Sequence, residues 1–202
     1  PISELPVGNT VKIAVNGTLR DFLIVHQGLP GAMYDDSCNG AWLLMKESIS
    51  TGQWNTNGSN SYNGSTGNNY LNSEFLNLLE SSIKDVIKQV KIPYRMNGGY
   101  GSDQSGANGL SCKSFLLSAY EVGVSISYTS REGNKLDYFD WNSGEDSKRI
   151  AYNGNYASIW WLRSADTDNS QSVMLILETG EPYSQHADYY NSFRPAFILP
   201  SD

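Results

Sequence analysis

A run of residues near the end of the chain carries side chains suited to contact with another molecule. The segment from Tyr183 to Ser192 consists almost entirely of Tyr, Ser, Asn, Asp, Gln and His, and no Lys, Arg or Trp lies between Ser164 and Phe193. Tyr gives a large contact area at a small entropic cost, and Ser and Asn give adaptable hydrogen bonds, as in antibody binding sites. The chemistry that this composition predicts is noncovalent recognition.

A second polar stretch, Asp166-Thr167-Asp168-Asn169-Ser170, precedes that run. Its oxygen-bearing side chains alternate as at the start of an EF-hand calcium loop. The sixth position of such a loop would be Gln171 rather than Gly, and the twelfth would be Leu177 rather than Glu. Calcium is therefore a minor alternative, and a second contact loop is the favoured interpretation.

Catalytic chemistry finds little support in the sequence. The two histidines are His26 and His186, and no HExxH, P-loop, GxSxG or complete GxGxxG pattern occurs. His26 ends a predicted strand and is interpreted as structural, whereas His186 lies in the polar run and is interpreted as a contact residue. Paired carboxylates for glycoside hydrolysis have no sequence signature, and no pair stands out. No cofactor or metal site is predicted.

The two cysteines, Cys38 and Cys112, form neither a CxxC motif nor a zinc-ligand pattern. We expect two small buried thiols, because free Cys is among the most buried residue types. A disulfide between them is the alternative.

Length and charge restrict the possible partners. A chain of 202 residues fits a single domain, 1–202, with one core. The net charge of −7 argues against nucleic acid, and no apolar stretch is long enough to insert into a membrane. One basic cluster, at Lys84, Lys88, Lys91 and Arg95, is predicted to be a solvated helix face that continues into a loop. The chain begins at Pro1 rather than Met, which is compatible with removal of a leader or an upstream domain.

Several segments predict the elements that must position the polar runs. Asn16-Gly17 between two apolar stretches predicts a type I′ hairpin, and Ala41–Met45 reads as a buried strand. The loop from Gln53 to Asn69 is expected to be anchored by Trp54 and Tyr62. Further strands are predicted at Ser114–Ser118, Ser158–Arg163, Val173–Leu177 and Ala196–Leu199, with a turn at Thr179-Gly180.

One amphipathic helix is predicted from Leu71 to Val90, because apolar residues recur there at three- and four-residue spacing. We expect it to be interrupted near Ser81-Ser82 and to end before Ile92-Pro93-Tyr94. A short element at Lys135–Trp141 is a further possibility.

Two pairs of large residues near the C-terminus are expected to stabilise the fold. Trp160 and Trp161 are interpreted as packing residues, with sugar stacking as the alternative. Arg163 and Arg194 lie beside apolar strand residues, where a guanidinium needs a carboxylate or main-chain carbonyls as partners.

The block Trp160–Ser164, followed by a polar stretch, Gly180, a second polar stretch and Arg194-Pro195-Ala196, resembles the variable proteins of diversity-generating retroelements of gut bacteria and their phages. Ser114–Ser118, Leu136–Phe139 and Arg149–Ala151 add to the resemblance. In that family a reverse transcriptase copies a template with adenine-specific errors, which scatter substitutions over the 3′ end of the gene. The resemblance implies an α+β, C-type lectin-like fold related to formylglycine-generating enzymes, mostly antiparallel sheet with one or two helices and long ordered loops.

The implied function is non-enzymatic binding of a protein or glycan ligand on a cell surface, for phage attachment or bacterial surface recognition. The diversified segment would be about 164–193, on a phage tail or an extracellular bacterial surface. Substitution of adenines in an Asn codon yields most of the residue types present, but Gln171 and Gln185 need another starting codon or a fixed position. The expected ligand contacts are Asp166, Thr167, Asp168, Asn169, Gln171, Tyr183, Ser184, Gln185, His186, Asp188, Tyr189, Tyr190 and Asn191.

Three tyrosines of this set, Tyr183, Tyr189 and Tyr190, are expected to be the anchors. The segment has acidic residues and no cation, so the expected ligand patch is neutral to basic. Two alternatives remain: a fixed carbohydrate-binding or structural module of a larger surface protein, and an enzyme similar to the formylglycine-generating branch. The oligomeric state is left open.

Overall fold

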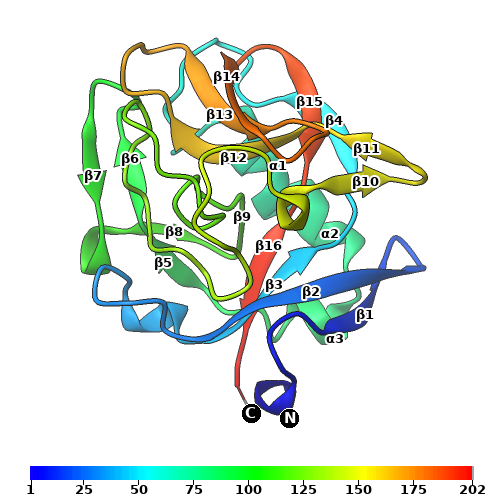
Figure 1. Ribbon diagram of the computed structural model, residues 1–202. Helices are drawn as coiled ribbons and strands as arrows, with labels where there is room; N and C mark the ends of the chain where they lie inside the picture. Colours follow the sequence, from blue (N-terminus) through cyan, green and yellow to red (C-terminus); the bar gives the residue numbers. More distant parts are fainter. Residues whose placement is uncertain (202) are drawn as a thin grey trace.

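A computed structural model describes residues 1–201 of the chain (Figure 1). Its strands are β1 (Thr10–Val15), β2 (Thr18–Gly28), β3 (Gly40–Met45), β4 (Ser50–Gln53), β5 (Val90–Ile92), β6 (Tyr94–Met96), β7 (Ser102–Gln104), β8 (Leu110–Cys112), β9 (Ser114–Phe115), β10 (Ala151–Asn153), β11 (Tyr156–Ser158), β12 (Trp160–Ala165), β13 (Ser172–Ile176), β14 (Pro182–His186), β15 (Tyr190–Phe193) and β16 (Ala196–Leu199). The helices are α1 (Thr66–Tyr70), the π-helical segment η3 (Leu71–Phe75), α2 (Leu76–Leu78) and α3 (Ser81–Lys84). Single 3-10 turns are η1 (Ile2–Glu4), η2 (Asp36–Cys38), η4 (Gly106–Asn108) and η5 (Ser147–Arg149).

Two five-stranded sheets form the framework. The first sheet has the order β1-β2-β3-β16-β9, and the second has the order β14-β13-β12-β15-β4. Every pairing is antiparallel except that of β12 with β15. The ribbons β5-β8, β6-β7 and β10-β11 complete the strand pairing. The α+β class and the predominance of antiparallel sheet are thereby confirmed.

The first sheet confirms the predicted hairpin. Asn16 and Gly17 both have positive φ, 50° and 74°, as a type I′ turn requires. The predicted buried strand at Ala41–Met45 is β3, in which every residue is buried. The C-terminal strand β16 lies between β3 and β9, so it joins β9 to the β1-β2-β3 part of the sheet.

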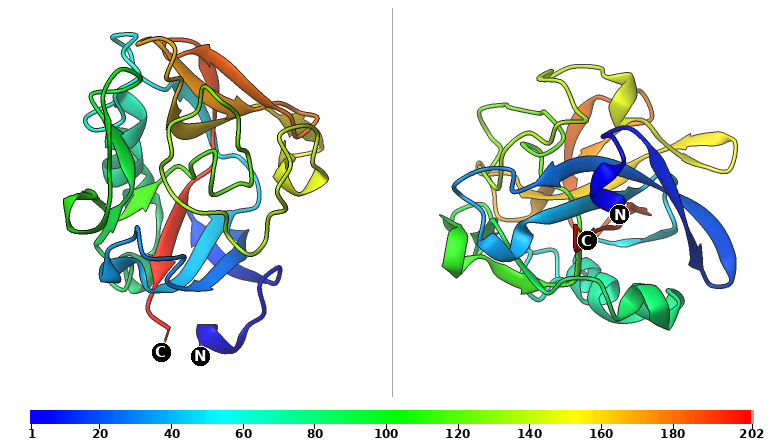
Figure 2. Two further views of the ribbon diagram at one scale, coloured as in Figure 1. Left: turned by 60° about the vertical axis from the view of Figure 1, so that its left-hand side comes forward. Right: turned by 90° about the horizontal axis from the view of Figure 1, so that it is seen from below.

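The second sheet lies at the opposite end of the molecule from η1 and the end of β16 (Figures 1 and 2). Its strands β12 and β13 are the predicted strands Ser158–Arg163 and Val173–Leu177, displaced by one or two residues. The predicted turn at Thr179-Gly180 is present, with Gly180 at φ 89°. Both polar runs therefore lie at the end of the molecule that is remote from η1.

The predicted amphipathic helix is wrong in its bounds. One continuous helix covers α1, η3 and α2, from Thr66 to Leu78, and a separate short turn follows in α3. Val90, placed in the helix by its spacing, lies instead in β5. Ser65 caps the true start, because its side chain accepts a hydrogen bond from the Asn68 main-chain nitrogen.

Other local predictions had mixed outcomes. The basic residues do not share one helix face: Lys84 is in α3, Lys91 in β5 and Arg95 in β6, where it pairs with Asp103 at 3.0 Å. The strand expected at Ser114–Ser118 is regular only at β9. Residues 116–146, all within the described range, form neither helix nor strand, so the element expected at Lys135–Trp141 is irregular.

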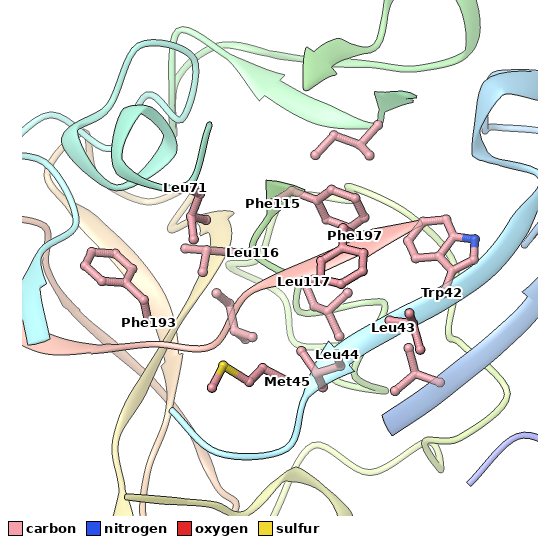
Figure 3. Packing of buried hydrophobic residues seen from close by; sticks show 14 of the residues in the cluster. Trp42, Leu43, Leu44, Met45, Leu71, Phe115, Leu116, Leu117, Phe193 and Phe197 are labelled. Carbon is pink, nitrogen blue, oxygen red and sulfur yellow. The ribbon is translucent and has the colours of Figure 1, made fainter. Parts of the chain in front are cut away.

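The core fills the space between the two sheets and the helix (Figure 3). Trp42 of β3 packs edge-on against Phe115 of β9, with ring centroids 5.5 Å apart. Phe197 of β16 packs against Phe22 of β2 at 5.2 Å. Leu71 of the helix lies in the same cluster. Within residues 1–201, no helix is long and apolar enough to cross a membrane.

Candidate ligand-binding surface

The strand β12 is a fully buried support for the polar runs. Trp160 donates its indole N–H to the main-chain oxygen of Arg149 at 2.9 Å, and Trp161 donates to that of Gly52 at 3.1 Å. Both rings have no exposed surface. The two tryptophans are therefore packing residues, as predicted, and they attach the 3-10 turn η5 and the edge strand β4 to β12.

Arg163 continues this support beneath the surface. Its guanidinium is fully buried and makes a two-pronged ion pair with Glu121, at 2.5 and 2.7 Å. It also donates to the main-chain oxygens of Pro93 and Leu116. The predicted need for a carboxylate and carbonyl partners is confirmed, and Arg163 connects strand β12 to residues 93–121.

Glu132 is a second buried carboxyl group beside Arg163, but the guanidinium donates to its main-chain oxygen rather than to its carboxylate. The carboxyl group accepts hydrogen bonds from the Arg95 main-chain nitrogen, at 2.7 Å, and from the Ser130 hydroxyl. Burial raises the pKa of Glu132 to about 7, against the opposing effect of nearby Arg163. The loop that carries Glu132 also supports the first polar run, since the main-chain nitrogen of Thr167 donates to Tyr128 at 2.8 Å.

Arg194 is likewise buried, and it interacts with strand β3 and with Trp160. Its Nε donates to the Met45 main-chain oxygen at 2.8 Å, and its guanidinium carbon lies 4.8 Å from the centre of the Trp160 ring. Burial lowers its pKa to about 10. The predicted main-chain partner is confirmed.

Asn60 holds the loop at 166–171 in place. Its side-chain nitrogen lies 3.2, 3.1 and 2.8 Å from the main-chain oxygens of Asp166, Asn169 and Ser172. Its side-chain oxygen accepts the Gly99 N–H at 2.9 Å. These contacts are to main-chain atoms of the loop, so they do not depend on the loop's own side chains.

Gly99 and Tyr100 complete this side of the loop. A Cβ on Gly99 would lie 2.0 Å from the Asn169 oxygen and 2.1 Å from the Asp166 oxygen, so only glycine fits. Tyr100 is 70% exposed and donates its hydroxyl to the Asp168 main-chain oxygen at 3.0 Å. Sequence reasoning missed Asn60, Gly99 and Tyr100; the glycine-rich run around Gly99 was the available signal for a close main-chain approach.

The predicted anchors of the loop at 53–69 are confirmed. Trp54 and Tyr62 are buried, with ring centroids 5.5 Å apart. Trp54 donates its indole N–H to Leu162 of β12 at 2.9 Å, and the Tyr62 hydroxyl accepts the Leu116 N–H at 3.0 Å. The loop that carries Asn60 is thereby fixed to the core.

The two polar runs meet at one end of the second sheet. Ser184 donates its hydroxyl to the Asp166 carboxylate at 2.6 Å, and the Ala187 main-chain nitrogen donates to Gln171 at 2.8 Å. Asp166 is only 7% exposed, so its side chain belongs to the support rather than to the accessible surface. The Asn169 side chain is similarly engaged, accepting the Ser172 N–H at 2.6 Å.

A compact turn follows β14. His186 Nδ1 lies 2.7 Å from the Asp188 carboxylate, and its ring packs edge-on against Tyr189 at 6.3 Å. Asn55 donates its main-chain N–H to Ala187, and the Gln53 side chain donates to Asp188. The turn is therefore held by residues 53–55, which donate to two of its main-chain oxygens.

The predicted tyrosine anchors are all accessible, with Tyr183 51%, Tyr189 56% and Tyr190 68% exposed. They do not form one cluster. Tyr183 lies opposite Leu175, and Leu175 lies opposite Trp161, so Tyr183 is on the same face of the sheet as Trp161. Tyr190 lies two residues before Ser192, which lies beside Trp160, so Tyr190 is on the same face as Trp160. Because side chains alternate along a strand, Tyr183 and Tyr190 lie on opposite faces of the second sheet.

We define the sheet-end surface as the accessible residues that the structure brings together around this turn and loop. Thr167, Asn169, Ser184, Gln185 and Asn191 are half-buried at its margins or in its strands, and Tyr183 lies on the other face. The members of the sheet-end surface are the exposed Asp168, Gln171, Tyr189 and Tyr190 and the partly exposed His186 and Asp188, whose side chains are 34% and 44% accessible.

The two cysteines and His26 lie away from the sheet-end surface and are buried. Cys38 and Cys112 are free and buried, as predicted, and burial raises the pKa of Cys38 to about 12. Burial also raises the pKa of Cys112. His26 is buried, with Nδ1 2.9 Å from the Asp137 carboxylate. Across the described part of the chain, no group of three or more His, Cys, Asp or Glu residues is arranged to hold a metal ion.

Comparison with known proteins gave one match. Residues 39–201 match a family described as a domain of unknown function, DUF6273. The matched range includes both polar runs, the helix and all of the second sheet. Neither the curated proteins nor the solved structures contain a match to the chain.

Proposed function

The chain belongs to the DUF6273 domain family, and we propose that it is a non-enzymatic ligand-binding domain that recognises a molecule on a cell surface. The observation that carries this proposal is the junction of two polar runs at one end of the second sheet. They are separated by β13 in the sequence, yet they are joined by the Ser184–Asp166 and Ala187–Gln171 hydrogen bonds. The resulting sheet-end surface is accessible, rich in amphipathic side chains and remote from η1.

The division between support and surface favours binding. The side chains of β12 are entirely buried, whereas Tyr189, in the turn before β15, and Tyr190, in β15, have more than half of their surface exposed. Substitutions in a packed core each cost about 0.5–3 kcal/mol, but exposed substitutions cost little. A surface of this kind can change its residues without loss of the fold.

The finer part of the proposal is a C-type lectin-like fold whose segment at about 164–193 is diversified by a retroelement. A mostly antiparallel framework with one main helix and long ordered loops is consistent with that fold. The Asp, His and Tyr residues of the sheet-end surface are consistent with adenine-directed substitution of an Asn codon, whereas Gln171 needs another starting codon or a fixed position. Phage attachment or bacterial surface recognition is the role proposed for such a surface.

The diversification is tested by deep sequencing of the 3′ end of the gene in its native population. Substitutions concentrated at adenines between the codons of Ser164 and Phe193, with a near-copy of that segment beside a reverse transcriptase gene, would support it. A uniform 3′ end without a template copy would leave a fixed binding module.

The ligand is proposed to be neutral to basic where it meets the protein. The accessible acidic residues in the segment are Asp168, Glu178, Glu181 and Asp188, and the segment contains no Lys or Arg. Complementary charge affects the association rate more than the affinity. We expect the association rate to fall with added salt, and an acidic polymer as the strongest binder would contradict this proposal.

Two alternatives can be distinguished from it. A fixed carbohydrate-binding module that stacks sugars on Trp160 or Trp161 is disfavoured because both rings are fully buried. An oxidase similar to formylglycine-generating enzymes would need reactive cysteines. Cys38 and Cys112 are buried, and their raised pKa values keep the thiols protonated.

The binding role is tested by screening the protein against glycan arrays and displayed cell-surface proteins. Alanine at Tyr189 and Tyr190 is expected to abolish binding, because accessible aromatic anchors usually dominate interface energy. Tyr156→Ala is the matched control, since Tyr156 is 81% exposed but lies on the β10-β11 ribbon. Equal loss of binding in the control, or none in the double variant, would refute the assignment of the surface.

A further inference from the structure

A groove of about 500 Å³ lies beside the free edge of the second sheet. One wall is β4, from Ser50 to Gln53, and the other is the helix, from Thr66 to Glu74. None of the expected ligand contacts lines it. A volume of this size is within the range of small-molecule and peptide subsites, about 300–1,000 Å³.

The edge strand offers main-chain hydrogen-bonding groups to this groove. β4 pairs with β15 alone in the described structure, with Thr51 opposite Ser192 and Gly52 opposite Asn191. The Ser192 main-chain N–H donates to the main-chain oxygen of Ile159, which directly precedes β12. The main-chain groups of Ser192 therefore point toward β12 and away from β4. The main-chain N–H and C=O groups of successive residues in an antiparallel pair point alternately toward the partner strand and away from it. Those of Gly52 therefore point toward β15, and those of Thr51 point away from it.

A second contact agrees with this assignment. The Gly52 main-chain oxygen accepts the indole N–H of Trp161, whose strand lies on the β15 side of β4. Thr51 and Gln53 therefore direct their main-chain N–H and C=O groups into the groove. Natural edge strands are commonly protected by Lys, Pro or a covering segment. β4 has the sequence Ser-Thr-Gly-Gln and none of these protecting residues.

The floor of the groove is aromatic and has a hydroxyl group. Tyr70 packs on Phe193 with ring centroids 5.3 Å apart. The Ser50 hydroxyl donates to the Tyr70 hydroxyl at 2.9 Å, which leaves the Tyr70 proton available to a ligand. An apolar floor beside a row of main-chain groups suits the alternating side chains of an added strand.

The charge of the groove indicates what such a strand carries. Glu74 is the one charged residue that lines it, and Glu74 is exposed and in no ion pair among the described residues. A Lys or Arg side chain on the ligand would complement it. The regular spacing of main-chain donors and acceptors along β4 matches that of an extended peptide, so these groups favour a peptide.

We propose that this groove binds an extended peptide, which adds as a sixth strand along β4 and directs a basic side chain to Glu74. The site is separate from the sheet-end surface. Its test does not depend on Tyr189 and Tyr190, so the failure of either proposal can be recognised independently.

The probe is a set of capped, fluorescently labelled heptapeptides that alternate valine and threonine, with one lysine moved through the seven positions. Binding is measured by fluorescence polarisation against the full chain. We expect at least one member to bind, and we expect Glu74→Gln to weaken it about two- to fivefold, as an exposed ion pair allows.

The decisive pair of variants is Thr51→Pro and Thr51→Ala. Proline removes the N–H that faces the groove and is tolerated on an edge strand, whereas alanine keeps that N–H. We expect about tenfold or greater loss of affinity with proline and little change with alanine, because proline leaves a buried peptide carbonyl without its partner. Equal affinities in the two variants would overturn the proposal.

A ligand-side measurement covers the case in which Thr51→Pro does not fold. N-methylation is placed at each peptide position in turn. Loss of binding at alternate positions supports strand addition, and uniform loss or uniform retention overturns it. The proposal is also overturned if no peptide binds, or if sedimentation shows a dimer of the parent protein that Thr51→Pro converts to a monomer.

Discussion

Arg163 carries a positive charge into the core, and two buried carboxyl groups lie near it. Glu121 pairs with the guanidinium directly, at 2.5 and 2.7 Å, whereas Glu132 is reached only through its main-chain oxygen. A single cation cannot fully compensate two buried anions, since the loss of hydration penalises each of them. This asymmetry explains why burial raises the pKa of Glu132 to about 7.

Stability is therefore expected to depend on pH through Glu132. Its pKa rises from 4.5 in the unfolded chain to about 7 in the folded protein, so between these values the folded state binds the extra proton. The free energy of unfolding then falls as pH rises through this window, by about 3 kcal/mol at most. Glu132→Gln should remove this dependence and be at least as stable as the parent protein at pH 7.5.

Urea unfolding of both proteins between pH 4.5 and 8 measures the effect. The stability of the Gln variant relative to the parent should increase across the window. Parallel pH profiles would mean that Glu132 is ionised throughout, with its charge compensated in the fold.

At the scale of elements, the helix shows where the sequence was informative and where it was not. Its apolar spacing was recognised, but the spacing continued through Val90, which lies in the short strand β5. A three-residue strand has too few residues to display an alternating pattern. The true start at Thr66 lies in a stretch rich in Asn and Gly, whose helical conformation depends on tertiary contacts. The Asn16-Gly17 turn, by contrast, was predictable because its geometry is set locally.

The helix start is expected to require Gly67. A Cβ at this position would lie 2.8 Å from the Phe193 ring and 3.3 Å from the Trp54 main-chain oxygen. Glycine to alanine within a helix ordinarily stabilises it by about 1 kcal/mol. We expect Gly67→Ala instead to destabilise the protein by about 1–3 kcal/mol, because the core there has no room.

Chemical denaturation compares this variant with Asn69→Ala, an exposed substitution in the same helix that should change stability by no more than about 0.5 kcal/mol. A stabilised Gly67→Ala variant would show that Phe193 can move aside at little cost.

At the scale of the whole molecule, the sequence predicted which residues contribute to the surface better than how these residues are arranged in space. The polar runs could be recognised from the sequence, and so could the burial of Trp160 and Arg163. Tyr183 and Tyr190 lie on opposite faces of the second sheet because of the register in which its strands pair, and this register cannot be read from the sequence. The support from Asn60 and Gly99 comes from segments about 70–110 residues away, and contacts over such separations leave no local pattern.

The exposed tyrosines are expected to contribute little to the stability of the whole domain. Simultaneous alanine substitution of Tyr183, Tyr189 and Tyr190 should lower Tm by no more than about 5 °C, since exposed substitutions each cost about 0.5 kcal/mol or less. Phe193→Ala is the contrasting variant, because it removes a buried ring and should cost about 3–5 kcal/mol. Scanning calorimetry measures both, and a comparable fall in Tm would make the tyrosines part of the core.

Asn60 binds the loop at 166–171 only through main-chain oxygens. The identity of the loop's side chains does not affect these hydrogen bonds, because every amino acid supplies the same main-chain carbonyl group. A laboratory library randomised at Asp168, Gln171, Tyr189 and Tyr190 should therefore retain a high fraction of folded members. The domain then becomes a starting point for directed evolution of binding reagents, with Asn60 and Gly99 kept constant.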